Sequence, residues 1–189
     1  MDAVEFNPSV TPRIKAHTRT LSSAARIQLS SSEIDLYSGD HKTLSASATR
    51  SEMDASGIVW ESSDTSVAAV NGSGVVTAKN PGTATITCYG KNARGIRATC
   101  KVTVKLRQTT GVKLVSGAFN RIRISWKVVP GCNRYDIYRR DESGNSKKMA
   151  TVTADVVTWQ DTAVKTGSTY TYRIRASYVR SGKNTVYGA

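Results

Sequence analysis

The feature that most constrains the fold is a succession of short runs of alternating apolar and polar residues, broken by turn residues roughly every eight to twelve positions. Between residues 26 and 104 the breaks are Ser38-Gly39-Asp40, Asn71-Gly72-Ser73-Gly74, Asn80-Pro81-Gly82 and the segment 92–95. A period of two places one side of each strand in a core and the other in water. No helix of three turns can be read here, so the sequence predicts an all-β sandwich or barrel.

The same pattern resumes after a polar stretch at residues 106–110, which suggests a short linker between two domains. In the first part we expect strands at residues 26–29, 33–37, 43–49, 58–62, 68–70, 75–78, 83–89 and 96–104. In the second part we expect them at residues 112–115, 121–126, 134–139, 148–153, 157–160, 170–178 and 185–187. We therefore predict one sandwich at residues 26–104 and another at residues 105–189.

Residues 1–25 differ from both parts, because polar, basic and small residues surround Pro8 and Pro12 without an apolar period. This composition predicts a flexible N-terminal segment or linker. It lacks the apolar stretch and cleavage site of a signal peptide, so a secreted parent would carry its signal outside this chain. The sequence has no apolar run of about 18 residues, and we expect no transmembrane segment.

Six short sequence motifs in the first part occur in an order that is characteristic of a known family. They are Ile27-Gln28-Leu29, Leu36-Tyr37-Ser38-Gly39-Asp40, Val59-Trp60-Glu61-Ser62-Ser63-Asp64, Val67-Ala68-Ala69-Val70, Gly74-Val75-Val76-Thr77-Ala78 and Pro81-Gly82-Thr83-Ala84-Thr85-Ile86-Thr87. Together they resemble the bacterial immunoglobulin-like group 2 family. The resemblance implies a sandwich that recurs in adhesins, in cell-wall proteins and beside the catalytic domains of secreted polysaccharide-degrading enzymes. Independently, the phase of Trp60 with Ile58 favours a core position between two sheets.

The second part carries a different resemblance. Its motifs are Ile122-Arg123-Ile124-Ser125-Trp126, Pro130-Gly131, Tyr135-Asp136-Ile137-Tyr138-Arg139 and the segment 167–176. Together they are similar to a fibronectin type III domain. The resemblance implies that Trp126 is a core residue and that the Tyr170 hydroxyl ties a loop to the sheet. Such domains normally continue their last strand beyond Tyr187, so we expect a shortened C-terminal edge and a fragment of a longer protein. The fold predicted is two tandem immunoglobulin-like β-sandwiches.

The net charge of +13 is distributed unevenly. Residues 26–104 hold 8 Lys and Arg against 7 Asp and Glu, whereas residues 105–189 hold 16 against 5. Strand arginines alternate with apolar residues, which predicts a polyanion-binding face at Arg121, Arg123, Arg139, Arg173 and Arg175. Its partner would be a cell-wall or host glycan or another polyanion. The alternative is that these cations only keep the strands soluble.

Specific recognition of nucleic acid is not expected, because no helix-turn-helix, zinc finger or RNP-like aromatic word is present. The two histidines, His17 and His41, have no metal-ligand spacing. No loop has the dense oxygen ligands that calcium needs. We therefore predict no catalytic site, no metal and no cofactor, and the chain is not expected to be an enzyme.

The three cysteines fall into a pair and a single residue. Cys88 and Cys100 lie six residues either side of Arg94, on the arms of a hairpin expected to turn near residues 92–95. They would face inward as cross-strand neighbours, which leaves two alternatives open: a disulfide in an oxidising compartment or two small buried thiols. Cys132 stands alone in a loop, and the sequence offers no histidine to activate it.

These observations predict a non-catalytic module of an extracellular or cell-surface protein. It would act as a stalk or adhesion domain and would bind an anionic glycan or wall polymer. The alternative function is an accessory spacer, or a carbohydrate-contacting region, of a secreted polysaccharide-active enzyme. As a fragment the chain is expected to be monomeric.

Overall fold

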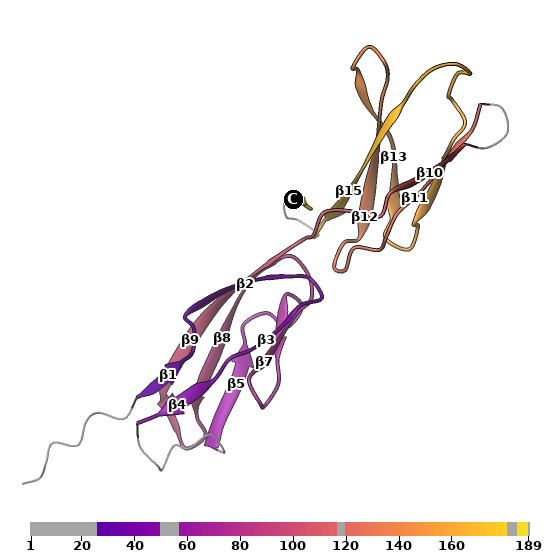
Figure 1. The fold of residues 1–189 in the computed structure, drawn as a ribbon. Helices are drawn as coiled ribbons and strands as arrows, with labels where there is room; N and C mark the ends of the chain where they lie inside the picture. Colours follow the sequence, from indigo (N-terminus) through magenta and orange to yellow (C-terminus); the bar gives the residue numbers. More distant parts are fainter. Residues whose placement is uncertain (1–25, 50–56, 117–119, 181–184, 189) are drawn as a thin grey trace, which may run out of the picture.

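The computed structural model describes residues 26–49, 57–116, 120–180 and 185–188, so the predicted flexible segment at residues 1–25 lies outside the described residues. All the regular elements in these ranges are β-strands, and they form two sandwiches placed end to end (Figure 1). The predicted all-β class with two tandem immunoglobulin-like sandwiches is confirmed. Within the described ranges, no helix has the length and apolar character that a membrane span requires.

The first module contains two sheets and a short strand pair. One sheet has the order β2-β9-β8-β5, the other has the order β3-β7-β6, and β1 pairs with β4. Strand β2 runs parallel to β9, and the other pairings are antiparallel. The bounds are β1 Ile27–Leu29, β2 Glu33–Tyr37, β3 His41–Thr43, β4 Ala46–Ala48, β5 Ile58–Ser62, β6 Ala68–Val70, β7 Val75–Ala78, β8 Gly82–Gly90 and β9 Ala93–Lys105.

The single strand expected at residues 43–49 is two strands in the structure. The chain leaves the β3-β7 pair at Leu44 and joins β1 through β4. The Leu44 N–H donates to the Gly74 carbonyl, while the next residue, Ser45, donates its N–H to the Ser30 hydroxyl. Adjacent residues therefore bond to different neighbours, and Leu44, 1% exposed, fills the core at the crossing.

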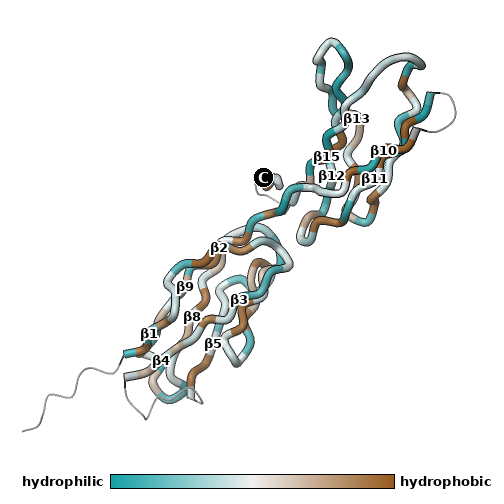
Figure 2. The backbone as a smooth tube through the Cα atoms, viewed as in Figure 1, coloured by the Kyte–Doolittle hydropathy of each residue, from teal (hydrophilic) through white to brown (hydrophobic). Residues whose placement is uncertain are grey.

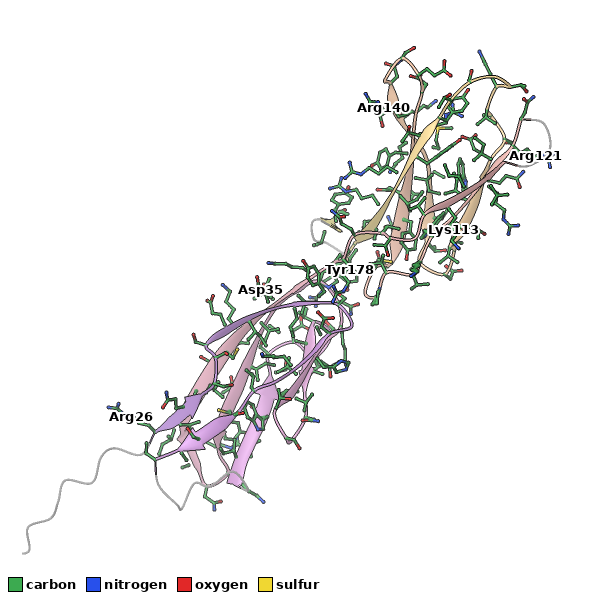
Figure 3. All side chains as sticks on the ribbon, in the orientation of Figure 1. Arg26, Asp35, Lys113, Arg121, Arg140 and Tyr178 are labelled. Atoms are coloured by element: carbon green, nitrogen blue, oxygen red, sulfur yellow. The ribbon has the colours of Figure 1, made fainter. Side chains whose placement is uncertain are left out.

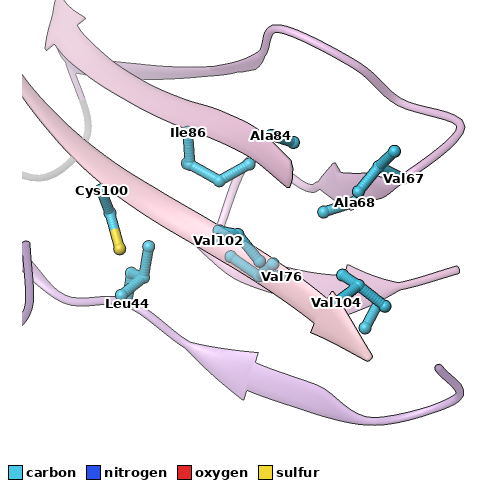
Figure 4. Packing of buried hydrophobic residues seen from close by; sticks show 10 residues of the cluster. Leu44, Val67, Ala68, Val76, Ala84, Ile86, Cys100, Val102 and Val104 are labelled. Atoms are coloured by element: carbon cyan, nitrogen blue, oxygen red, sulfur yellow. The ribbon is translucent and has the colours of Figure 1, made fainter. Parts of the chain in front are cut away.

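The core of the first module consists mainly of small aliphatic side chains (Figure 4). Val76, Ile86 and Val102 are fully buried between the two sheets. Trp60 packs against this core but is only half-buried, so it covers the core's side rather than filling its centre as the sequence predicted. The buried members are Leu44, Val67, Ala68, Val76, Ala78, Ala84, Ile86, Cys100, Val102 and Val104.

The second module has a sheet of order β10-β11-β14 and a larger sheet of order β13-β12-β15-β16, all antiparallel. Its strands lie within one or two residues of the predicted positions. The bounds are β10 Lys113–Ser116, β11 Ile122–Ser125, β12 Arg134–Arg140, β13 Ser146–Thr153, β14 Thr158–Asp161, β15 Thr171–Tyr178 and β16 Val186–Tyr187. The hairpin that joins β12 to β13 is strongly hydrophilic (Figure 2).

An aromatic pair fills the second core. Trp126, 5% exposed, meets Tyr135 edge to face with ring centroids 5.4 Å apart. The Tyr135 hydroxyl accepts a hydrogen bond of 2.8 Å from the Val129 N–H, and burial raises the pKa of this phenol to about 12. The Tyr170 hydroxyl accepts from the Lys165 N–H at 3.2 Å, five residues upstream. Both roles implied by the second resemblance, a core Trp126 and a loop tied by Tyr170, are thus present.

Candidate functional site: a direct joint and a basic second module

In the sequence, a single residue separates the last buried residue of the first core from the first buried residue of the second. Val104, 3% exposed, belongs to the first core, and Leu106, 1% exposed, belongs to the second. Lys105, between them, ends β9 and accepts a hydrogen bond of 3.0 Å at its carbonyl from the Ser38 N–H. The linker expected at residues 106–110 therefore begins with a core residue. Because both neighbours of Lys105 are held in packed cores, the backbone has little freedom to pivot here.

A loop of the second module packs against turns of the first. Gly131, with a φ of 74°, lies so close that a Cβ on it would overlap the Ser38 side chain and come within 2.6 Å of the Lys79 carbonyl oxygen. A Cβ on Gly39 would lie 3.2 Å from the Pro130 Cβ. Glycine is therefore required at position 131 both by the backbone conformation and by the approach of the other module.

Two ion pairs cross the same joint, and the labelled Tyr178 marks this region of the molecule in Figure 3. Arg107 donates to Asp40 at 2.6 Å, and its guanidinium lies 4.5 Å from the centre of the Tyr37 ring. Arg180 donates to Asp64 at 3.0 Å. Such partly exposed pairs add little stability one by one, but here they lie beside packed backbone and fix the orientation that the packing allows.

Both carboxylates at the joint are held ionised by their partners. The hydrogen bond from Arg107 lowers the pKa of Asp40. The Ser66 hydroxyl, and after it Arg180, lowers the pKa of Asp64 to about 2. A carboxyl group with a lowered pKa contributes fully above its ordinary value of 3.8 and loses that contribution as the pH falls toward the lowered one. The joint contacts are therefore intact at neutral pH.

The arginines predicted as one binding face lie in three different settings. Arg123 is on β11, directly preceded by Arg121 and Ile122, in the smaller sheet of the second module. Arg173 and Arg175 are on β15 in the larger sheet. The structure therefore brings Arg173 and Arg175 together and separates them from Arg123, because β15 and β11 belong to opposite layers of the sandwich.

Arg139 joins the two layers of the second module. Its guanidinium donates to the Asp161 carboxylate at 2.9 Å and to the Ala163 carbonyl at 3.0 Å, and it lies 4.9 Å from the centre of the Tyr170 ring. Tyr172 also donates to Asp161, at 2.8 Å, and burial followed by this hydrogen bond raises the pKa of the phenol. Because its guanidinium already binds these partners, Arg139 forms a structural ion pair inside the module and does not belong to an outward binding face.

The two cysteines of the first module are diagonal neighbours. Strand β9 begins at Ala93, earlier than expected, and a register shift at Tyr89 places Cys88 opposite Ala98 and Cys100 opposite Ile86. Diagonal residues on an antiparallel pair have Cα atoms roughly 7–8 Å apart, which exceeds the usual span of a disulfide. Both thiols are buried and free, and burial raises the pKa of each. A disulfide stays a prediction, and this register does not favour it.

The third cysteine and the acidic residues provide no clear reactive centre. Cys132 is half-buried, and burial raises its thiol pKa, which disfavours the nucleophilic thiolate. Across the described ranges, no group of three or more His, Cys, Asp or Glu side chains has a geometry that could hold a metal ion.

Comparison with known proteins identifies the first module. Residues 23–102 match the family model described as bacterial Ig-like domain (group 2). This part of the chain is a bacterial Ig-like domain of group 2. The family predicted for it from sequence is therefore confirmed. Domains of this kind are typically non-catalytic and are usually found in extracellular or surface proteins of bacteria.

Parts of the chain are similar to a much longer bacterial protein and to solved fibronectin type III structures. An uncharacterized protein of Clostridium acetobutylicum is 36% identical over 81 residues, which are 43% of this chain and 8% of that protein. A fibronectin type III-like protein from Clostridium thermocellum is 28% identical, covering 44% of this chain and 86% of that one, with a TM-score of 0.35. A segment of two fibronectin type III domains from chicken tenascin is 15% identical, covering 59% of this chain and 65% of that one, with a TM-score of 0.46.

Sequence reasoning placed Lys148 among the basic strand residues but missed the two tyrosines next to the β15 arginines. Tyr138 lies between Lys148 and Arg173, and Tyr187 stacks on Arg175. Period-two alternation already places Tyr138 and Lys148 on the outward side of their strands. The contact of Tyr187 carries no local signal, because it depends on how β16 pairs with β15. Residues 26–104, in contrast, have a nearly balanced charge, with 8 Lys and Arg against 7 Asp and Glu.

Proposed function

We propose that this chain is a non-catalytic spacer of an extracellular or cell-surface bacterial protein, in which two sandwiches are held as one rigid unit. The observation that carries the proposal is the joint, where Val104 and Leu106 belong to different cores with only Lys105 between them. A stalk must hold the domain that it carries at a fixed distance and orientation from its support. A joint without a flexible linker can do this. Packed turns and two cross-module ion pairs support the same role.

Small-angle X-ray scattering of the whole chain tests this function. We expect one extended conformation to fit the scattering curve. Inserting the four-residue segment Gly-Ser-Gly-Ser between Lys105 and Leu106 should broaden the distance distribution, because a flexible segment would replace a direct connection. The same insertion between Ser143 and Gly144, in the exposed β12–β13 hairpin, is the control and should leave the shape unchanged. A wild-type curve that requires many module orientations would contradict a rigid spacer.

The same unit would serve a surface stalk or an accessory spacer of a secreted polysaccharide-active enzyme. Both uses need a fixed separation between a binding or catalytic part and its support. The sequence that flanks this chain in its gene distinguishes the two uses. A catalytic domain in the same protein favours the accessory spacer, and repeated modules with a wall anchor favour the stalk.

A second function is favoured by the charge of the second module. Residues 105–189 carry 16 Lys and Arg against 5 Asp and Glu, so the module attracts anionic polymers such as wall polymers or acidic glycans. This contact would add adhesion to the spacer. The test is binding of the whole chain to such polymers at low ionic strength, with binding lost as salt increases. Absence of binding at low salt would remove this second function.

A further inference from the structure

The outward side of the larger sheet in the second module carries two neighbouring arginines, Arg173 and Arg175, that form no ion pair with the described residues. We call it the β15 face. Its residues occupy the outward positions of β12, β13 and β15, on the side opposite the buried Tyr135, Ile137, Ile174 and Ala176. Strand pairing sets Tyr138 between Lys148 and Arg173. It sets Asp136 between Thr151 and Arg175. The face thus consists of two neighbouring rows of side chains across three strands.

The only carboxylate in these two rows is already committed. Asp136 is 5% exposed and accepts hydrogen bonds at its Oδ1 from the Thr151 hydroxyl at 2.6 Å and from Lys148 at 3.1 Å. No ion pair to Arg173 or Arg175 occurs among the described residues. The two arginines therefore keep their positive charge without a carboxylate partner in that part of the chain.

Arg175 is held in a fixed position. Its guanidinium lies 3.7 Å from the centre of the Tyr187 ring, a cation–π contact that restrains the side chain. Its Nε is buried and lacks a hydrogen-bond partner among the described residues. A buried charged donor without an acceptor is costly, and an anionic oxygen would satisfy it. This arrangement differs from an ordinary surface arginine, whose donors are all hydrated.

We propose that the β15 face binds an acidic polysaccharide or wall polymer, with Arg175 as the anchoring residue for a carboxylate or phosphate group and Arg173 as a second contact. The inference rests on the proposed contact with anionic polymers and names its site. Same-face residues on a strand are about 7 Å apart, so the two arginines would meet successive acidic groups of a repeating polymer. Tyr187 favours this occupant over a nucleic acid, because Arg175 occupies one face of its ring and so reduces the aromatic surface on which a base could stack.

Matched substitutions in the whole chain test the site, with affinity measured for polygalacturonate as the carboxylate probe and poly(glycerol phosphate) as the phosphate probe. We expect Arg175→Ala to weaken binding about tenfold, as expected for a charge-assisted hydrogen bond. Arg121→Ala removes the same charge from the other sheet and should weaken binding only about twofold by loss of general attraction. Arg175→Lys should not restore affinity, because lysine lacks the planar fork.

A second pair of variants leaves the net charge unchanged. Tyr187→Ala should weaken binding several-fold because it releases the Arg175 guanidinium, while Tyr187→Phe, which keeps the ring, should bind as the wild type does. Melting temperatures of all variants verify that the second module remains folded. The polymer that loses more affinity in Arg175→Ala identifies whether carboxylate or phosphate is the preferred group.

The outcomes separate failure of the site from failure of the function. Equal losses in Arg175→Ala and Arg121→Ala would overturn the site while leaving general polyanion binding in place. No binding of wild type to either polymer at low salt would overturn both. Tighter, Arg175-dependent binding of a single-stranded oligonucleotide than of either polymer would overturn the polysaccharide as the occupant.

Discussion

The first module fills its core with small aliphatic side chains and two buried thiols, whereas the second places an aromatic pair and a buried Arg139–Asp161 ion pair between its sheets. The first is nearly neutral, and the second carries most of the net charge. The same layered architecture is thus stabilised in two ways. The contrast teaches that the Ig-like module suits support, while the second module has the exposed cations that a partner would contact.

The buried ion pair offers the largest test of this contrast. Asp161→Ala should lower the free energy of unfolding of the second module by about 3 to 5 kcal/mol, because Arg139 and Tyr172 would lose a shared buried acceptor. Denaturant titration followed by NMR signals of each module measures the effect separately. Asp155→Ala, an exposed carboxylate in the same module, is the control and should change stability little. An equally small effect of Asp161→Ala would show that the two cores do not differ as described.

The joint can be perturbed at one glycine. Gly131→Ala should destabilise the chain by about 1 to 3 kcal/mol more than Gly167→Ala. Both residues have positive φ, 74° and 85°, but a Cβ at position 167 meets no atom within 4 Å while one at position 131 meets the first module. The difference between the variants therefore isolates the cross-module contact from backbone strain. Equal thermal stabilities would mean that the packing at Ser38 contributes nothing.

The smallest expected effect concerns the Asp64 carboxylate. Arg180→Ala should raise the pKa of Asp64 from about 2 toward its ordinary 3.8 without reaching it, because the Ser66 hydroxyl remains the larger cause of the lowered value. An NMR titration of the carboxyl carbon measures this shift. The Asp155 pKa, lowered mainly by the Thr153 hydroxyl, should not move. An unchanged Asp64 pKa would show that Arg180 does not reach across the joint in solution.

Strand positions were predictable from sequence because alternation and turn residues are local signals. The phase of alternation also indicates which strand arginines point inward, and the prediction of the binding face did not take this phase into account. Arg139 follows Tyr135 and Ile137 at intervals of two on β12, and this phase points inward toward Asp161. The separation of Arg123 from Arg175 required the order of strands in two sheets, which no local pattern contains.

The joint was not predictable for a similar reason. Leu106 continues the spacing of two set by Val102 and Val104, which predicts an inward position, but this local pattern does not say which of the two cores it enters. Its burial depends on how the second sandwich folds back onto the end of β9. The cysteine register depended on the bulge at Tyr89, which moves the turn by a few residues and changes every pairing along the hairpin.

Residual dipolar couplings of the whole chain in a dilute aligned medium test most directly whether the two sandwiches form one rigid unit. Couplings from the strands of each module yield an alignment tensor. We expect the two tensors to agree in magnitude and orientation when referred to the structure, because only Lys105 separates the buried Val104 of one core from the buried Leu106 of the other. Tensors of clearly different magnitude would mean that the modules reorient independently, and would contradict a rigid unit.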